Sequence, residues 1–219
     1  MMIRKLLLGA AIAASCFMAD AQNLVRITGN NVNLREMPSA QSAKAGTALL
    51  GMVFNDLGTQ DGWTRIKDLK GKEMYISSKF AKPLTAEEQK DFTADLCVMD
   101  RAEKEDALHA TGYSQTMTSK DGQSEESTTW HFMSEKGKPG IIAEMNWQWA
   151  NTSGQMRGNT LYYKGDIRGW YIVLTDEVEE DGSNPRKLDE PIYVYPAYTP
   201  DANVIVNDKK YAWPDEEWG

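Results

Sequence analysis

Hydrophobic and polar residues alternate early in the chain with the period of a β-strand. Val32 and Leu34 alternate with polar neighbours, and Pro38 then interrupts the ladder because proline has no backbone N–H. An apolar run of strand length follows at residues 48–54, and an Asp-Gly pair at residues 61–62 marks a turn before further apolar positions. This pattern predicts a small β-unit over residues 22–84.

The pattern changes at Thr85, where a helix is expected to begin. Thr85 and Glu88 have the spacing of a capping box, in which each side chain bonds the backbone N–H of the other residue. Phe92, Leu96 and Met99 recur at spacings of four and three and form one apolar stripe. Residues 85–107 are therefore predicted to form a short helical linker.

Residues 108–219 return to strand patterns that are separated by turn-forming clusters. These clusters are rich in Gly, Asn, Asp and Ser, and they lie at residues 119–123, 135–139, 151–154 and 164–166. No helical pattern separates the strands. The spacing predicts an antiparallel β meander, closed as a sandwich or barrel, so the whole chain is expected to be all-β with two units.

One strand of the second unit has a regular apolar face. That face carries five side chains, namely Ile141, Ala143, Met145, Trp147 and Trp149, while polar residues alternate with them. The interpretation that needs no further assumption is that both indoles fill the core. The alternative is that they stack on a carbohydrate, because an indole combines a flat apolar face with a polar edge.

The start of the chain resembles an export signal. Two basic residues precede an apolar stretch at residues 6–18, and Ala21 followed by Gln22 ends an A-x-A cleavage motif. The apolar stretch is shorter than the roughly 20 residues that span a bilayer. We therefore expect a signal peptide at residues 1–21, cleavage between Ala21 and Gln22, and a periplasmic or extracellular protein with no transmembrane segment. The alternative is a lipoprotein signal in which Cys16 becomes the lipid-anchored residue.

Charge and cysteine content narrow the classes of function. Removing residues 1–21 takes away two basic residues and one acidic residue, so the formal charge of −8 becomes about −9. Such an acidic chain is not expected to bind nucleic acid through bulk charge. The mature chain would retain only Cys97, so no internal disulfide is expected, and packing must supply its stability.

No arrangement of residues indicates catalysis or a cofactor. Cys97 lies among apolar neighbours and is expected to be a buried thiol, and His109 stands beyond a charged stretch. His131, between two aromatic residues, is expected to face solvent or fill a turn. The acidic residues at 176–181 lack the register of a calcium loop, so we expect a solvated loop and no metal site.

Three short segments in residues 23–84 carry a family resemblance. Asn-Val-Asn-Leu-Arg-Glu-Met-Pro-Ser at 31–39, Gly-Trp-Thr-Arg-Ile at 62–66 and Met-Tyr-Ile-Ser-Ser-Lys-Phe at 74–80 occur in this order. Together they resemble a bacterial SH3-type domain, which implies a small SH3-like barrel. The family has a second Gly-Trp-Val where this chain has Met74-Tyr75-Ile76, so the aromatic residue is kept and the glycine is lost.

The resemblance also implies a type of function and a place for it. In the family a groove lies between loops of the barrel, which would place Arg35, Trp63 and Tyr75 nearby. For each of these three residues the alternative is a purely structural role, and we expect Trp63 to contribute more to the core than to ligand contact. The ligand class implied is a cell-wall peptide or fragment, or a protein partner.

The preferred hypothesis is therefore an exported, non-enzymatic envelope protein whose SH3-like module binds such a ligand. One alternative is an enzyme with a carboxylate-based hydrolytic site in the second unit, using Glu144 and Asp166 as acid and base. Another alternative is a structural subunit of an envelope assembly.

Overall fold

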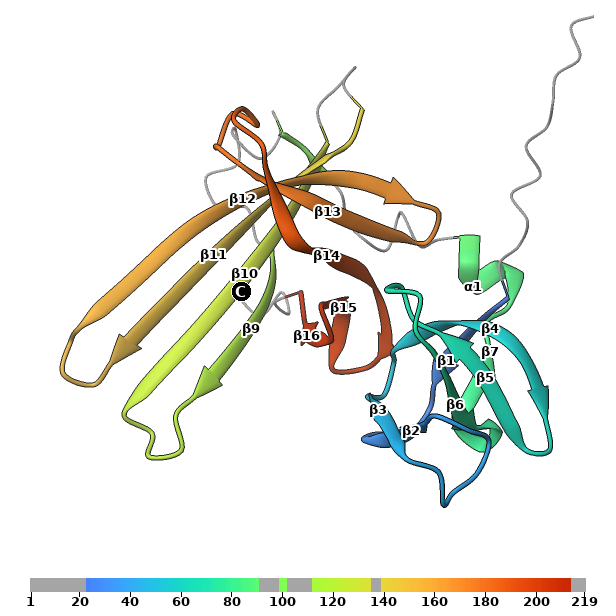
Figure 1. The fold of residues 1–219 in the computed structure, drawn as a ribbon. Coiled ribbons are helices and arrows are strands. Elements are labelled where there is room, and N and C mark those ends of the chain that lie inside the picture. The colour runs from blue at the N-terminus through green and yellow to red at the C-terminus, as the bar shows by residue number, and fades with distance from the viewer. Residues whose placement is uncertain (1–22, 91–98, 102–111, 135–138, 214–219) are drawn as a thin grey trace, which may run out of the picture.

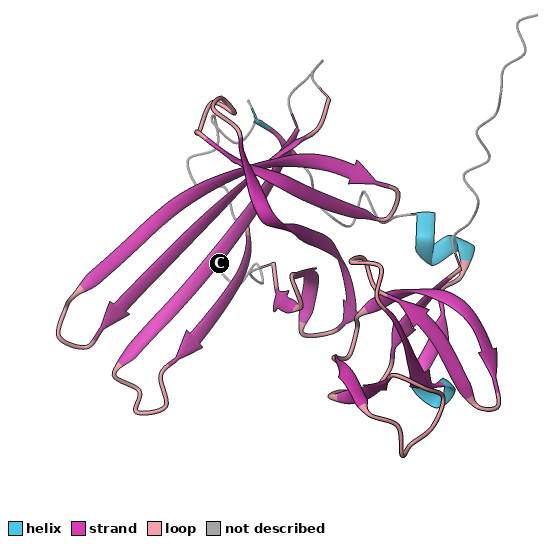
Figure 2. Cartoon of the chain, viewed as in Figure 1, coloured by secondary structure: helices cyan, strands magenta, loops and turns pink. Residues whose placement is uncertain are grey.

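The structure is a computed structural model that describes residues 23–90, 99–101, 112–134 and 139–213. Within these residues the chain is almost entirely β-structure, arranged as two sheets that lie side by side (Figure 1). Figure 2 shows how little helix accompanies the strands. None of the helices in the described ranges is long and apolar enough to cross a membrane.

The first sheet has seven strands and is formed by the N-terminal unit. Its spatial order is β3-β2-β6-β5-β4-β1-β7. The strands are β1 (Leu24–Ile27), β2 (Val32–Arg35), β3 (Lys44–Ala48), β4 (Val53–Gln60), β5 (Trp63–Lys67), β6 (Glu73–Ser77) and β7 (Ala81–Pro83), with the 3-10 helix η1 (Ser78–Phe80) before β7. The strand pairings are antiparallel, including the pairing of β1 with both β4 and β7.

The core of this unit follows the alternation in the sequence. Val32 and Leu34 of β2 are buried, while Asn33 between them is exposed. Ile66 and Ile76 face the same interior from β5 and β6. The prediction of a small β-unit is therefore confirmed, because successive side chains of a strand point to opposite faces.

The helical linker is confirmed at its start but not along its whole length. The amide of Glu88 donates to Thr85 Oγ1 at 3.1 Å, and the amide of Thr85 donates to Glu88 Oε2 at 2.7 Å, as a capping box requires. These bonds begin α1 (Ala86–Lys90). The expectation that Met99 lies on the same helix is wrong, because Met99–Asp100 form strand β8, which pairs in parallel with β10. Phe92 and Leu96 lie outside the described residues.

The second sheet is a long antiparallel meander that nearly closes into a barrel. It contains β9 (Tyr113–Thr118), β10 (Ser124–Ser134), β11 (Ile141–Asn151), β12 (Met156–Arg168), β13 (Tyr171–Val178), β14 (Arg186–Thr199), β15 (Ala202–Val206) and β16 (Lys209–Tyr211). Each strand pairs with the next one in the sequence. Ser114 and Ala212 exchange two backbone hydrogen bonds, of 2.7 and 2.9 Å, and so join β9 to the end of the meander. Of the two architectures expected, the barrel is confirmed.

The turn expected at residues 164–166 is wrong. These residues continue β12, which carries a register shift between Lys164 and Gly165 where it pairs with β13. A Cβ on Gly165 would stand 1.9 Å from the carbonyl oxygen of Val173, so glycine is required for the close approach of the two backbones. The chain turns instead at Gly169, immediately before Trp170.

Two hydrophobic cores hold the chain together, and the first extends across both sheets. The cluster around the N-terminal unit also includes three buried side chains of the second sheet, Trp170, Tyr195 and Ile205. Polar contacts join the same surfaces: the amide of Tyr198 donates to the carbonyl of Gly51 at 3.2 Å, and Lys70 Nζ lies 2.8 Å from Glu190 Oε2. The two units therefore share an apolar interface.

Several expected features lie outside the described residues. They are the signal peptide at residues 1–21, its cleavage position between Ala21 and Gln22, the alternative lipidation position Cys16, and the side chains of Cys97 and His109.

Candidate functional site

The N-terminal sheet carries a groove of about 390 Å³ between its loops. The groove is bordered by the β4–β5 hairpin, by the loop after β2 and by the outer side chains of β5 and β6. Its lining consists of Pro38, residues 57–61, Trp63, Arg65 and Tyr75. It therefore lies at the end of the sheet where three separate segments of sequence meet.

The hairpin wall of the groove is fixed by its turn. Asp61 and Gly62 both have positive φ values, 51° and 78°, which is the conformation of a tight two-residue hairpin. The expected turn at residues 61–62 is thus confirmed. In β4, the strand before this turn, the amide of Gly58 donates to Asp56 Oδ1 at 2.8 Å. The turn brings Trp63 back beside Gln60, its partner across the two strands.

Trp63 and Tyr75 supply the aromatic surface of the groove. Both are partly exposed, although the main-chain neighbours Thr64 and Ile76 are buried. The expectation that Trp63 belongs mainly to the core is therefore wrong: its side chain is on the outer face of β5, and the buried positions of that strand are Thr64 and Ile66. Alternation along β5 gives this result directly once the strand begins at Trp63 rather than before it.

Arg65 is a groove residue that the sequence did not single out. It lies opposite Tyr75 in the pairing of β5 with β6, and its guanidinium makes an ion pair and hydrogen bonds with Glu73. The hydrogen bond to Glu73 raises the pKa of Arg65 above its ordinary value. The sequence feature that could have identified Arg65 is its two-residue spacing from Trp63, which places both side chains on the same face of one strand.

Arg35 has a different role from the one expected. It faces Tyr75 in the pairing of β2 with β6, but its guanidinium donates to the carbonyl of Ser42 at 2.8 Å. It therefore holds the loop between β2 and β3 and is not part of the groove lining. Of the three expected ligand residues, Trp63 and Tyr75 line the groove, whereas Arg35 lies beside Tyr75 on β2 and outside the lining.

Two further hollows lie where the two units meet. One, of about 460 Å³, is bordered by the β4–β5 face and by Tyr171. The other, of about 60 Å³, has Asp68 and Lys70 on one wall and Asp208, Asn207 and two tyrosines on the other. Loss of hydration raises the pKa of Asp208 there, and the nearby carboxylate of Asp68 adds to this while Lys70 opposes it.

The carboxylates considered for catalysis do not converge. Glu144 is mostly buried; it accepts a hydrogen bond from Asn146 Nδ2 at 2.8 Å, and its Oε1 is 3.6 Å from Nδ1 of His131. Asp166 is exposed and pairs with Arg168. Glu144 is paired with Tyr162 on β12, and Asp166 is four residues further along that strand, roughly 13 Å at 3.3 Å per residue. That separation exceeds the spacing of paired carboxylates in glycoside hydrolysis.

Two other expectations about polar residues are corrected by the structure. His131 neither faces solvent nor fills a turn, since it is 6% exposed and lies in the middle of β10 beside β11. Asp176 and Glu177 belong to β13 rather than to a loop, and they make ion pairs with Lys187 and Arg186 of β14. Within the described ranges, no three His, Cys, Asp or Glu side chains are grouped so that they could hold a metal ion.

Comparison with known families agrees with this geometry. Residues 30–82 match the family described as Bacterial SH3 domain, and they span β2 to β7 with the complete lining of the groove. The resemblance expected from the three short segments is therefore confirmed, and residues 30–82 of the first sheet belong to a bacterial SH3 domain. No curated protein matches the chain.

Proposed function

We propose that this chain is an exported envelope protein whose bacterial SH3 domain binds a cell-wall peptide or an extended segment of a partner protein, without catalysing a reaction. The observation that supports this most directly is the groove beside Trp63 and Tyr75. It combines two partly exposed aromatic rings with the polar groups of Arg65 and Asp61. Aromatic and arginine side chains of this kind contribute most of the binding energy at small interfaces.

The shape of the groove favours a short and extended ligand. Its volume of about 390 Å³ falls in the range of ordinary small-ligand sites, and it is open to solvent along one side. A shallow site with few anchors is expected to bind in the micromolar range, which corresponds to about 8 kcal/mol of binding free energy. The ligand would lie across the rings and place a carboxylate or carbonyl near Arg65.

Calorimetric titration of the mature chain with soluble wall-derived peptides tests the proposal. Tyr75→Ala and Trp63→Ala are each expected to lower the affinity at least tenfold, since each removes an aromatic anchor worth more than about 1.4 kcal/mol. Tyr75→Phe, which keeps the ring, should retain most of the affinity. Lys44→Ala, an exposed change on β3 outside the groove, serves as the matched control.

Mass analysis of the same samples separates binding from catalysis. The peptides should be recovered unchanged after incubation with the protein. Cleaved peptide would assign the protein to an enzyme class, and equal affinity in the wild type and the two alanine variants would remove the groove as the binding site.

A further inference from the structure

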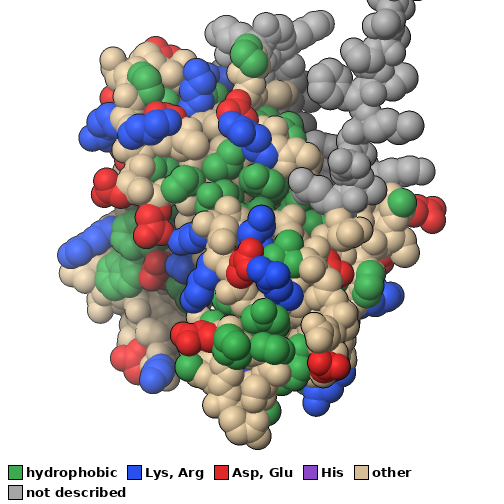
Figure 3. Space-filling view, turned by 45° about the vertical axis from the view of Figure 1, so that its right-hand side comes forward, with side chains coloured by type: hydrophobic (Ala, Val, Ile, Leu, Met, Phe, Trp, Pro, Cys, Tyr) green, Lys and Arg blue, Asp and Glu red, His purple; other side chains and the backbone are tan. Residues whose placement is uncertain are grey.

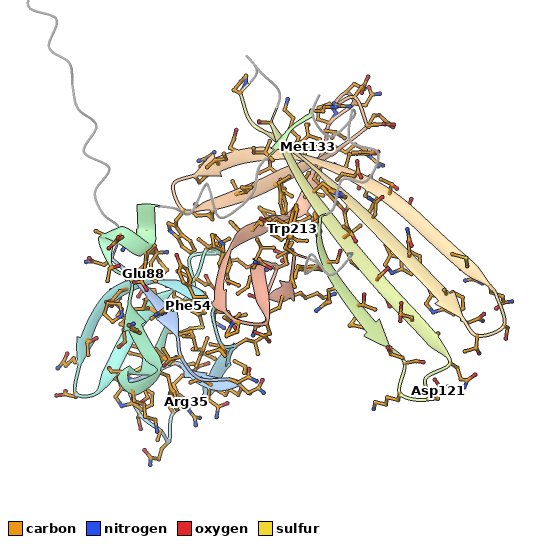
Figure 4. All side chains as sticks on the ribbon, turned by 180° about the vertical axis from the view of Figure 1, so that it is seen from behind. Arg35, Phe54, Glu88, Asp121, Met133 and Trp213 are labelled. Carbon is orange, nitrogen blue, oxygen red and sulfur yellow. The ribbon has the colours of Figure 1, made fainter. Side chains whose placement is uncertain are left out.

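The second sheet extends beyond its closed part and forms a four-stranded platform. We use this name for residues 115–118 of β9, 124–128 of β10, 147–151 of β11 and 156–160 of β12. β13 pairs with β12 only from Tyr162 onward, and β16 reaches β9 only through the bridge at Ser114. In Figure 1 the platform projects at the lower left, away from β13 to β16, and in Figure 4 Asp121 marks one of its tips.

Two rows of side chains cross one face of the platform. The strand pairings place Trp147 in one row with Gln115, Thr128 and Asn159, and Trp149 in the next row with Met117, Glu126 and Arg157. The row before them contains Tyr113 and Trp130, which are buried in the barrel core. This face is therefore the continuation of the barrel interior past the point where the barrel is closed.

The platform face is accessible rather than filled. Met117 is 45% exposed, Arg157 is exposed, and both indoles are partly exposed. The two indoles stand two residues apart on β11, which separates them by about 7 Å along the strand. Figure 3 shows hydrophobic side chains with charged neighbours beside a hollow on the platform side of the molecule. The expectation that both indoles fill the core is thus wrong.

The two charged groups on this face differ in their contacts. Trp147 Nε1 donates to Glu126 Oε1 at 2.8 Å, so that carboxylate already has a partner. The guanidinium of Arg157 lies over the ring of Trp149, 5.8 Å from its centroid. Among the residues that the structure describes, no carboxylate forms a salt bridge with Arg157. The face therefore presents two aromatic rings, the Glu126 carboxylate held by the Trp147 indole, and the Arg157 guanidinium, which is available to an anion.

We propose that the platform face binds a saccharide chain that carries carboxylate groups. Two neighbouring sugar rings would stack on Trp149 and Trp147, because an indole offers a flat apolar face to the apolar face of a sugar. The carboxylate of the saccharide would pair with Arg157, as charge complementarity requires. The side-chain amides of Gln115 and Asn159 lie in the same row as Trp147 and would bond the hydroxyl groups. A single cation on an acidic chain is too little for a nucleic acid, whose binding depends on many phosphate contacts.

Titration with tetragalacturonate and with the neutral tetramer cellotetraose, followed by NMR or calorimetry on the full mature chain, tests the proposal. Tetragalacturonate should bind, and Trp149→Ala should weaken it at least tenfold. Arg157→Ala should bring the affinity for the acidic tetramer down to that for the neutral one. Arg157 is exposed, so this variant is expected to fold normally, which circular dichroism would check.

Met156→Ala is the matched control. Met156 is 75% exposed and adjacent to Arg157, but alternation places it on the opposite face of β12, so its removal should leave binding unchanged. Tyr75→Ala should also leave it unchanged, which separates this surface from the SH3 groove. Failure of both tetramers to bind, or an equal loss in the Met156 variant, overturns the proposal. Dimerisation that disappears in Trp149→Ala, without saccharide binding, would assign the face to a second copy of the chain instead.

Discussion

The interface between the two units makes the stability of the SH3 domain depend on a residue of the barrel. Trp170 is 4% exposed, belongs to the hydrophobic cluster of the SH3 domain, and makes edge-to-face contacts with Tyr171 and Tyr195 at centroid distances of 5.3 and 5.5 Å. The Trp170→Ala variant removes an aromatic side chain that buries about 150–250 Å². At 25 cal/mol per Å² this area corresponds to roughly 4–6 kcal/mol, an upper estimate. Measured losses for such substitutions are about 3–5 kcal/mol, which is the loss we expect.

Trp130→Ala is the matched control, because Trp130 is also 4% exposed but belongs to the separate core of the barrel. Hydrogen exchange followed by mass spectrometry reports the opening free energy of each strand. In Trp170→Ala the amides of β4 to β6 should exchange at least tenfold faster, a loss of about 1.4 kcal/mol, although the substitution is in the other unit. In Trp130→Ala these amides should exchange at the wild-type rate while those of the barrel accelerate. Unchanged exchange of β4 to β6 in Trp170→Ala would show that the interface does not stabilise the SH3 domain.

Three further outcomes are expected. The pKa of Asp208 is raised in the folded state, so the stability that it contributes is complete below the ordinary value of about 3.9 and is lost as the pH rises through the raised value. Urea titrations should therefore find Asp208→Asn more stable than the wild type at pH 7 and similar to it at pH 3; a less stable variant at pH 7 would contradict this. Gly165→Ala should destabilise by several kcal/mol in the same assay, because its Cβ would overlap the Val173 carbonyl, whereas Gly169→Ser, in open space, should cost about 1–2 kcal/mol for its positive φ. Mass spectrometry of the exported protein should find Gln22 at the N-terminus, and an acylated Cys16 would establish the lipid-anchored alternative.

The sequence predicted those parts of the fold that depend on interactions between residues close together in the chain. The turn at Asp61 and Gly62 follows from residues that tolerate positive φ, and the capping box at Thr85 and Glu88 follows from the bonds available to those two side chains. The alternation of Val32 and Leu34 identified the buried face of β2. Each of these features involves residues fewer than five positions apart, so no knowledge of the partner strands was needed.

Features that depend on distant partners were not predicted. The same Gly-containing pattern at residues 164–166 suits a turn or a bulge, and only the approach of Val173 from β13 decides between them. The sequence around Trp170 could not show that this side chain joins the SH3 core, because the buried residues of that core come from the distant segment 24–84. The expectation for His131 rested on its place between two aromatic residues, and that local context cannot show that the side chain is buried in the middle of β10.

The platform shows how strand length carries information that alternation does not. Regular alternation continues from Ile141 to Trp149 without a change in pattern. It shows that the five apolar side chains of this segment share one face of β11, but it does not show which of them are buried. β12 is 13 residues long whereas β13 is 8, so β12 must extend past its partner by several residues. At 3.3 Å per residue that difference is roughly 16 Å, enough to carry Trp147 and Trp149 beyond the closed barrel. Among the described residues β13 pairs with β12 only from Tyr162 onward, so the tryptophans on this extension are better placed to meet a ligand than to fill a core.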